Sequence, residues 1–413
     1  MLKKWGIKYA GESNSLRAIG RTLLDTLISS VRKATRRMLY GAKTIAGRKI
    51  PVDLLPVRFL AALVGLLFLS ACDDMTDKTP AGGELPDNAT SSRLYILSEG
   101  LIHLNNSTLA LYDFETRTTA TDWFGTVNGR KLGDTANDMG IYGTKLYLVV
   151  STSGLVEVVD KLTGRSLKQI AMKDGIGRSR EPRNIAFSDG FAYVCSFDGT
   201  VAEIDTATLS ITRITTAGRN PDGITVAGGN LYVSNSGGLS FPNYDSTVSV
   251  IDPVTFKEIR KIEVGANPFT LQADSRGQLY VVTRGNYGNE RYQLHHIDTR
   301  THQYLGTIEG AHPLNFTLSN DTLWMYSFDH STGDSEFQTY DTRSGALSTS
   351  GFIDPALLKT PFGITRNGSN GELFITDAGS YTTRGEVLCF SRDGQLKYRL
   401  KGVGVNPKKV VVE

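Results

Sequence analysis

The sequence is poor in cysteine, with only 3 among 413 residues, and none belongs to a C-x-x-C or Cys/His motif. A structural zinc site, which needs closely spaced thiolate and imidazole ligands, is therefore not expected. Cys195 in "AYVCSF" and Cys389 in "EVLCF" lie in strand-like apolar runs, so we expect two buried, inert thiols. A chain with so few cysteines must hold itself together through its apolar core.

Histidine is also scarce, with 6 residues spread along the chain. His295 and His296 are adjacent, and neighbouring side chains of a strand point to opposite faces, so they make a poor metal pair. No G-x-S-x-G motif and no phosphate-binding glycine loop stands in a suitable context. The sequence therefore predicts no catalytic residue, no metal site and no cofactor.

The apolar run at 59–71 falls short of the ~20 residues that a membrane-spanning helix takes. It ends in "LSAC", which resembles the lipobox of bacterial lipoproteins, whose cysteine is lipidated and becomes the mature N-terminus. We therefore expect a signal peptide at 58–71, a lipid on Cys72, a flexible tether at 72–92, and membrane contact through the lipid alone. A buried core helix is the alternative for the apolar run.

Residues 1–57 are basic and amphipathic, as an organellar transit peptide would be. A lipobox has no use in an organelle, so we interpret this stretch as a non-native upstream extension, with the true start near Met38 or later. The full chain has a formal net charge of +3, but residues 1–71 hold 13 Lys and Arg against 3 Asp and Glu. The mature chain, with 32 basic and 39 acidic residues, is therefore near −7. Nucleic-acid binding, which depends on a basic surface, has no support.

A short apolar-aromatic strand recurs along the rest of the chain. Its seven copies are centred on Tyr95, Tyr147, Tyr193, Tyr232, Tyr280, Trp324 and Phe374. Successive copies are 39 to 52 residues apart, a period that is typical of β-propeller blades with four strands each. Most units open with an X-Pro step, and proline belongs where a strand begins because it cannot donate to a sheet. A later strand of the unit ends in Asp before a polar turn.

The two ends of the repeat region predict how the ring closes. The region opens with "RLYIL", a second strand without a first strand ahead of it, and ends with "NPKKVVVE", a first strand without a partner behind it. Pairing the two completes a seventh blade and leaves no exposed sheet edge. We therefore predict an all-β fold: one closed, monomeric, seven-bladed β-propeller at 93–413, with its C-terminal strand in the N-terminal blade.

The repeat of X-Pro, Leu-Tyr-Val and Val-Ile-Asp resembles the YncE-type propellers of bacterial envelopes. The segments "LYILSEGLIHLNNSTLALYD" and "NGRKLGDTANDMGIYGTKLYLVV", within residues 94–150, resemble surface lipoproteins of Bacteroidetes, including the BtuG-type propellers that capture cobalamin beside an outer-membrane transporter. The acidic residues after Cys72 are similar to the surface-export signals of that phylum. The resemblance implies a protein anchored in the outer membrane and facing the cell exterior, with a corrinoid ligand and a TonB-dependent transporter as partners.

Candidate ligand residues come from the loops that share one face of such a ring. Expanded loops between second and third strands carry aromatic, Arg and Asp side chains, which suit a large, flat ligand with a polar edge. The X-Pro loops add amide, carboxylate and imidazole groups, and the non-repeating segment 128–139 adds two more side chains. The candidates are Arg130, Asn137, Asn220, Asp222, Phe241, Tyr244, Asn267, Arg284, Tyr287, His312, Asp377 and Tyr381. Packing between blades and ordinary turn chemistry are the alternatives, and segment 128–139 is equally a packed insertion.

The leading hypothesis is a lipid-anchored surface protein that binds a nutrient, with a corrinoid as the best guess, and passes it to a TonB-dependent transporter. A propeller lactonase or lyase acting on a sugar acid is the first alternative, and it requires a metal in the channel. A scaffold that binds only a neighbouring envelope protein is the second.

The lipobox interpretation predicts the mass of the mature protein. Because cleavage precedes Cys72, we expect residues 1–71 to be absent from native material. Intact-mass or N-terminal analysis measures this directly, and peptides from that stretch in the mature protein would contradict it.

Overall fold

The computed structural model describes residues 92–288 and 290–413. The predicted upstream extension, signal peptide and lipidated Cys72 lie outside the described residues, as does all of the predicted tether except Ser92. In the described part of the chain, no helix is both long enough and apolar enough to cross a membrane. The short α3 (Trp123–Asn128) and the 3-10 turn η2 (Pro355–Leu357) are the helical elements described here.

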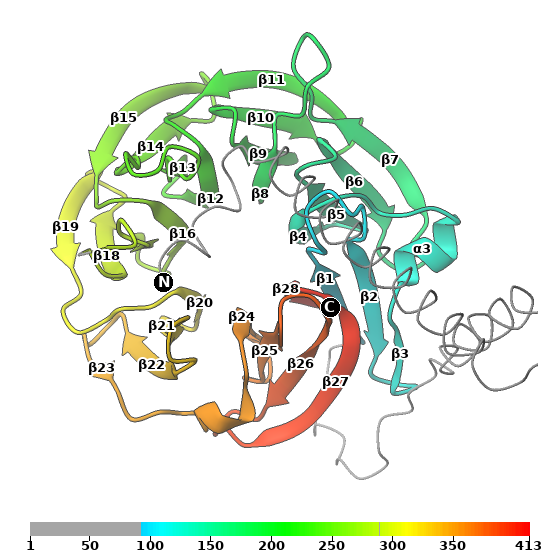
Figure 1. Ribbon diagram of the computed structural model, residues 1–413. Helices are drawn as coiled ribbons and strands as arrows, with labels where there is room; N and C mark the ends of the chain where they lie inside the picture. Colours follow the sequence, from blue (N-terminus) through cyan, green and yellow to red (C-terminus); the bar gives the residue numbers. More distant parts are fainter. Residues whose placement is uncertain (1–91, 289) are drawn as a thin grey trace, which may run out of the picture. The chain divides into compact units, whose positions relative to one another are not determined.

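Seven four-stranded antiparallel sheets stand in a ring around a common axis, which we call the channel axis (Figure 1). This arrangement confirms the predicted all-β, seven-bladed propeller. Blade 1 contains β28 (Pro407–Val412), β1 (Arg93–Ser98), β2 (Thr108–Asp113) and β3 (Thr118–Ala120); blade 2 contains β4 (Ala136–Tyr142), β5 (Lys145–Val150), β6 (Leu155–Asp160) and β7 (Ser166–Ala171). Blade 3 contains β8 (Pro182–Ser188), β9 (Phe191–Ser196), β10 (Thr200–Asp205) and β11 (Ser210–Thr216).

The remaining blades repeat this order, with the first strand nearest the channel and the fourth at the rim (Figure 1). Blade 4 contains β12 (Pro221–Ala227), β13 (Asn230–Asn235), β14 (Thr247–Asp252) and β15 (Lys257–Glu263); blade 5 contains β16 (Pro268–Ala273), β17 (Gln278–Thr283), β18 (Gln293–Asp298) and β19 (Gln303–Thr307). Blade 6 contains β20 (Asn315–Ser319), β21 (Thr322–Phe328), β22 (Ser335–Asp341) and β23 (Leu347–Ser348); blade 7 contains β24 (Pro361–Arg366), β25 (Leu373–Asp377), β26 (Arg384–Phe390) and β27 (Leu396–Val405).

The ring closes where β28 pairs antiparallel with β1, as predicted from the two ends of the repeat region. The partners include Ile96 opposite Val410, and Val410 is 1% exposed. Outside the ladder, the Tyr95 hydroxyl lies 2.9 Å from Glu413 Oε2, and Glu413 forms an ion pair of 2.8 Å with Lys161 of blade 2. The last residue of the chain is therefore bonded to two blades.

The recurring aromatic residue of each second strand packs between neighbouring blades. Tyr95, Tyr147, Tyr232 and Phe374 are fully buried, and the apolar clusters of the core draw on strands of adjacent blades. The predicted thiols of Cys195 and Cys389 are confirmed as free and buried. Trp324 is the exception among the repeated aromatics, since it is only half-buried.

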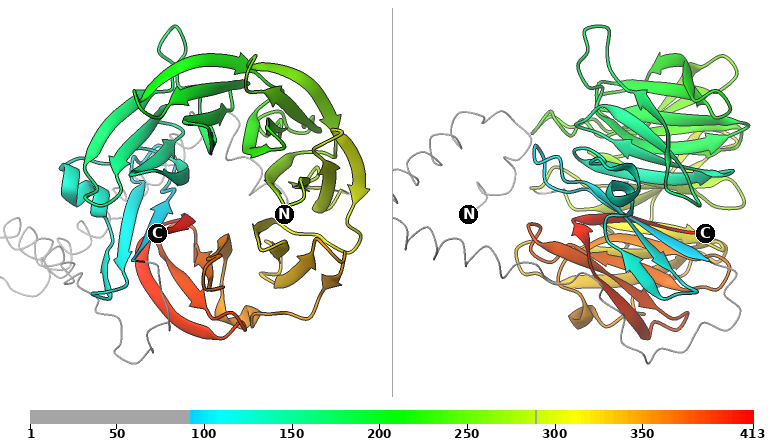
Figure 2. Two further views of the ribbon diagram at one scale, coloured as in Figure 1. Left: turned by 180° about the vertical axis from the view of Figure 1, so that it is seen from behind. Right: turned by 90° about the vertical axis from the view of Figure 1, so that its right-hand side faces the viewer.

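Two kinds of loop meet on one side of the ring, which we call the upper face. It is formed by the loops that lead into the first strands and by those that join second to third strands. A backbone hydrogen bond ties the two loops together in blade after blade, for example from Phe197 N–H to Glu181 C=O (3.0 Å) and from Arg284 N–H to Asn267 C=O (2.9 Å). The hairpins between first and second strands and between third and fourth strands form the lower face. Figure 2 shows the ring from its side.

Closure of the ring predicts a large effect of Val410→Asp. The change removes apolar packing and buries a carboxylate without a partner, so we expect a loss of about 3–5 kcal/mol of unfolding free energy. Val254, which is 82% exposed in a lower-face turn, provides the matched control, and Val254→Asp should change stability by less than about 0.5 kcal/mol. Urea unfolding measures both, and equal effects would contradict the closure argument.

Candidate ligand-binding site

Each blade places one side chain at the upper mouth of the channel, from the residue that follows the X-Pro step or its counterpart. In most blades this residue is bulged, because the register with the second strand shifts there, and a bulge re-aims a side chain. Hydrogen bonds from Lys408 to Asn137 and from Arg183 to Asp222 join such residues of neighbouring blades. We call the full set the mouth ring: Asn137, Arg183, Asp222, Phe269, Leu314, Phe362 and Lys408.

The mouth ring is polar in blades 1 to 4. Lys408 Nζ donates to Asn137 Oδ1 over 2.7 Å and lies 4.0 Å from Glu99 Oε2. Arg183 Nε donates to Asp222 Oδ1 over 2.9 Å. Burial lowers the pKa of the Lys408 ammonium, while the nearby carboxylates of Glu99 and Asp222 act against that shift. Predicted residues Asn137 and Asp222 are thus part of one charged network.

The ring is apolar in blades 5 to 7, and here an aromatic cluster surrounds a cation. The Arg284 guanidinium lies 3.5 Å from the centre of the Phe269 ring, a cation–π contact that gains strength out of water. Phe241, Tyr244 and Tyr287 form edge-to-face pairs with centroid distances of 6.1 and 5.9 Å. Phe241 is 68% exposed and Tyr287 is 52% exposed. These four predicted residues therefore lie together, with two aromatic faces open to solvent.

The cluster continues into blades 6 and 7. The Tyr381 ring lies 6.0 Å from that of Phe362, and its hydroxyl lies 3.3 Å from His330 Nδ1. Burial raises the pKa of Tyr381 to about 12, and the neighbouring Tyr292 hydroxyl adds to this shift. His312, a predicted ligand residue, lies with its Nδ1 2.9 Å from the Tyr292 carbonyl oxygen, so it holds the loop that carries Tyr292.

Arg284 carries a polar atom that the protein leaves without a partner. Its Nε is buried and makes no hydrogen bond to any residue in the described part of the chain. An unmet buried donor costs about 1–3 kcal/mol, and such groups in native proteins call for an explanation. An acceptor on a bound molecule would remove this cost.

Two predicted asparagines have structural roles in the X-Pro turns. Asn220 and Asn267 adopt positive φ angles of 46° and 60°, a backbone region in which asparagine is favoured over most residues. Asn220 also donates from Nδ2 to the Phe197 carbonyl (2.8 Å) and accepts from Leu239 N–H (3.3 Å). Both side chains belong to turns that support the mouth ring.

Asp377 likewise holds a loop together. Its carboxylate, which is 3% exposed, accepts hydrogen bonds from the backbone N–H groups of Lys359, Thr360 and Gly379. These contacts fix the path into β24 and the start of the loop that carries Tyr381. These backbone hydrogen bonds explain the position of the Asp377 carboxylate without a ligand.

The two ends of segment 128–139 have different roles: one fits the packed insertion and the other fits the channel mouth. Arg130 lies away from the mouth ring, where Nη2 contacts Glu157 Oε1 (2.9 Å) and Ser166 Oγ (3.0 Å) and the guanidinium covers Phe124 of α3. Its side chain fits the packed insertion. Asn137, at the other end of the segment, belongs to the mouth ring.

The sequence reasoning did not single out Arg183, Phe269, Phe362 or Lys408 as site residues. Each directly follows an X-Pro step, and aligning the repeats on that proline places them in one column. These equivalent positions share no residue type, since their side chains differ in size and charge from blade to blade. The position directly after the X-Pro step is therefore the sequence feature that identifies them.

His295 is a satisfied core residue. It is 1% exposed, with Nε2 2.9 Å from Thr283 Oγ1 and Nδ1 3.0 Å from the Tyr304 hydroxyl. Burial lowers its pKa to about 4. Among the residues that the structure describes, no group of three His, Cys, Asp or Glu side chains is arranged to hold a metal ion.

Comparisons with known proteins bear on the fold. The family described as a domain of unknown function (DUF5074) matches residues 93–379. No curated protein matches this sequence.

Three solved structures are similar to this chain at low sequence identity. A quinonprotein alcohol dehydrogenase-like protein from Bacteroides thetaiotaomicron has a TM-score of 0.58 at 17% identity, over 78% of this chain and 78% of its own. The computationally designed Ika8 protein has a TM-score of 0.51 at 14% identity, over 79% of this chain and 92% of its own. Hydrazine synthase of Kuenenia stuttgartiensis has a TM-score of 0.50 at 18% identity, over 61% and 74%. These likenesses show the fold alone.

The buried, neutral His295 predicts acid sensitivity. Between pH 6.5 and about 4 the unfolded chain binds a proton that the folded protein does not, so stability falls as pH falls, by about 3 kcal/mol for this group. His295→Gln should flatten that part of the stability curve, whereas His103→Asn at an exposed position should leave it unchanged. Urea unfolding across pH 4–7 provides the measurement, and parallel curves for wild type and His295→Gln would contradict the assignment.

Proposed function

Because the chain belongs to the DUF5074 family, a domain of unknown function, we propose its function from the geometry of the upper mouth: the protein binds a large, flat small molecule there. The mouth has a charged half and an aromatic half, and a flat molecule with a polar edge matches both. In this proposal the protein is a binding protein and not an enzyme.

The observation that carries this proposal is the arrangement around Arg284. Its guanidinium is held against Phe269 while Nε has no partner, and Tyr287 beside it is half exposed. An aromatic wall with a positioned, unpaired donor is what orients a ligand that has an apolar face and acceptor atoms at its edge. The charged network of Lys408, Asn137 and Glu99 offers donors and acceptors across the mouth.

A corrinoid is the ligand that we propose. Its macrocycle is flat and its rim carries amide groups, so the ring face would cover Tyr287 and Phe241 while the amides meet Arg284 and the charged side. The resemblance of residues 94–150 to BtuG-type propellers supports this choice over other flat ligands.

We further propose that the protein is a lipoprotein of the outer membrane that faces the cell exterior and delivers its ligand to a TonB-dependent transporter. The lipobox at Cys72 supports the anchor. Loops of the upper face expose apolar side chains, including Leu104 (56%), Ile176 (76%) and Leu239 (42%). Apolar loop tips around a ligand site suit transient contact with a partner protein.

Calorimetric titration with cobalamin and cobinamide tests the ligand. We expect saturable binding to the purified protein, weakened about 10- to 30-fold by Arg284→Ala or Tyr287→Ala, because central Arg and Tyr contacts carry about 1.5–2 kcal/mol each. Arg260→Ala and Leu305→Ala, exposed positions on the outer strands, are the matched controls and should bind like wild type.

No heat for either corrinoid at protein concentrations well above micromolar would remove the corrinoid. Binding that survives both Arg284→Ala and Tyr287→Ala would remove the upper mouth as the site. Metal analysis of the same preparation separates the hydrolase or lyase alternative, which requires a divalent ion in the channel.

A further inference from the structure

A cavity lies on the lower face between blades 6 and 7, at the opposite end of the strands from the upper mouth. It has a volume of about 480 Å³ and is lined by the β20–β21, β24–β25 and β26–β27 hairpins. The half-buried Trp324 forms one wall. The proposed corrinoid site uses none of the residues that line this cavity.

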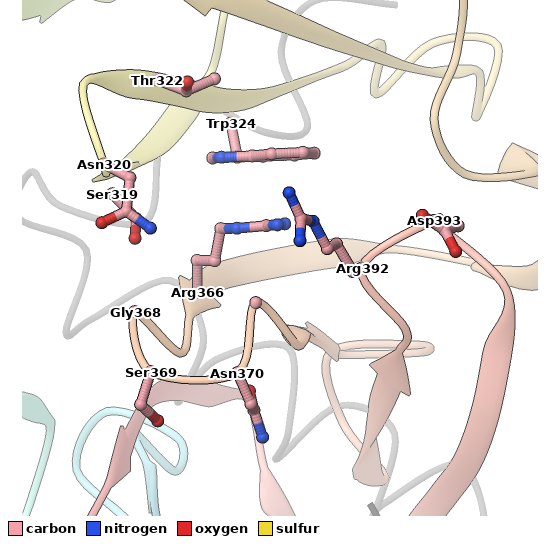
Figure 3. Close-up of a pocket in the computed structure, with 11 residues that line it drawn as sticks. Ser319, Asn320, Thr322, Trp324, Arg366, Gly368, Ser369, Asn370, Arg392 and Asp393 are labelled. Atoms are coloured by element: carbon pink, nitrogen blue, oxygen red, sulfur yellow. The ribbon is translucent and has the colours of Figure 1, made fainter. Parts of the chain in front are cut away.

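Two arginines face each other in this cavity (Figure 3). The Arg366 guanidinium lies flat on the Trp324 indole, 3.7 Å from the ring centre. Arg392, from the neighbouring hairpin, reaches toward the same point (Figure 3). Burial lowers the pKa of Arg366, and the charge of Arg392 lowers it further. Two like charges are therefore held together in a partly desolvated place.

Neither cation has an acidic partner. Among ion pairs within residues 92–288 and 290–413, none includes Arg366 or Arg392, whereas Arg276 and Arg300 in the lower-face hairpins of blade 5 each pair with an aspartate. Arg276 contacts Asp274 at 2.9 Å and Arg300 contacts Asp298 at 3.3 Å. The arginines of the cavity thus differ from their counterparts in blade 5.

The acid nearest in sequence does not compensate the pair. Asp393 lines the cavity, but its carboxylate lies on the far side of Arg392 from Arg366 (Figure 3) and makes no ion pair in the described structure. The adjacent Glu372 is bound by Lys397 Nζ at 2.6 Å. Within the described residues, no carboxylate forms an ion pair with either guanidinium.

We propose that this cavity binds a small molecule through an oxyanion group, a phosphate or a carboxylate. Guanidinium forks match such groups in geometry and charge, and two forks suit an anion with several oxygens. Trp324 Nε1 is buried without a hydrogen-bond partner, which leaves one further donor in the same wall. Asn320 lines the side of the cavity toward which that nitrogen lies (Figure 3).

The size of the cavity indicates that the anion is part of a larger molecule. A volume of about 480 Å³ falls within the roughly 300–1,000 Å³ of small-molecule sites and exceeds the space that a free phosphate needs. The stacked Trp324 and Arg366 provide a flat wall for the organic part. We therefore expect an organic phosphate or polycarboxylate to bind more tightly than inorganic phosphate.

Calorimetry and thermal unfolding of the purified full chain, with inorganic phosphate, glucose 6-phosphate and citrate as probes, test this site. We expect at least one probe to bind saturably and to raise the melting temperature by mass action. Arg392→Gln should weaken that binding on the order of tenfold, as expected for one lost charged hydrogen bond. Arg366→Lys keeps the charge but loses the planar fork, so it should weaken binding as well.

Arg300→Gln is the matched control: it removes the same charge from the same face, but from an arginine that already has a partner. It should leave binding unchanged. Without anion, Arg392→Gln should melt no lower than wild type, because it relieves the repulsion with Arg366. Tighter binding of glucose 6-phosphate than of citrate assigns a phosphate, and the reverse order assigns a carboxylate.

Three results would overturn the site: no saturable binding of any probe at millimolar concentrations, equal binding by wild type and Arg392→Gln, or equal weakening by Arg300→Gln. Each leaves the corrinoid proposal untouched, because those titrations report on the upper face and use different variants.

Discussion

The pairing of β28 with β1 is the constraint on which the rest of this structure depends. Each blade buries apolar side chains against the next blade, so the core is a ring of interfaces. If blade 1 did not form, its interfaces with blades 7 and 2 would both be exposed. Closing the ring brings the last residues of the chain against the first ones. The chain contains no disulfide among its described cysteines, and this ladder holds the two ends of the ring together in place of one.

In the closed ring all blades have the same orientation, so equivalent loops of every blade lie on the same face. In most blades an X-Pro turn precedes the first strand at the upper face, and a bulge behind it re-aims one side chain. In blades 1 to 5 the residue before the first strand has a positive φ, while the side chain that follows the turn varies from blade to blade. Lys408 and Asp222 therefore occupy positions equivalent to those of Phe269 and Phe362. The same position of the repeat therefore carries charged side chains on one side of the mouth and aromatic side chains on the other.

This division explains how much the sequence could predict. The blade number, the closing strand and the buried aromatic of each second strand follow from periodicity, because every copy obeys the same packing demand. Phe241, Tyr244, Arg284 and Tyr287 could be found because they lie in loops longer than the repeat requires. Asn267 and Asp377 were predicted from their chemistry, but both have structural roles. Asn267 precedes a proline in a turn with positive φ, and Asp377 accepts hydrogen bonds from backbone N–H groups at the end of β25. Whether Arg130 faced the mouth or α3 depended on contacts distant in sequence, which no local pattern reports.

On the lower face, most third strands end in Asp, and the hairpins of blade 7 differ from this pattern. The carboxylate of this Asp accepts from the next backbone N–H groups, as Asp298 does from Arg300. In blade 5 the Asp298 carboxylate also forms an ion pair with the Arg300 guanidinium. In blade 7 the corresponding hairpins supply Arg366 and Arg392 without that carboxylate, and blade 6 supplies a tryptophan at the place where the other blades bury an aromatic completely. Three local departures from the repeat thus meet in one cavity. Packing alone would favour restoring the repeat at each of them, since doing so would bury the aromatic and remove the repulsion, and an anion bound between the two arginines gives all three departures a common physical reason.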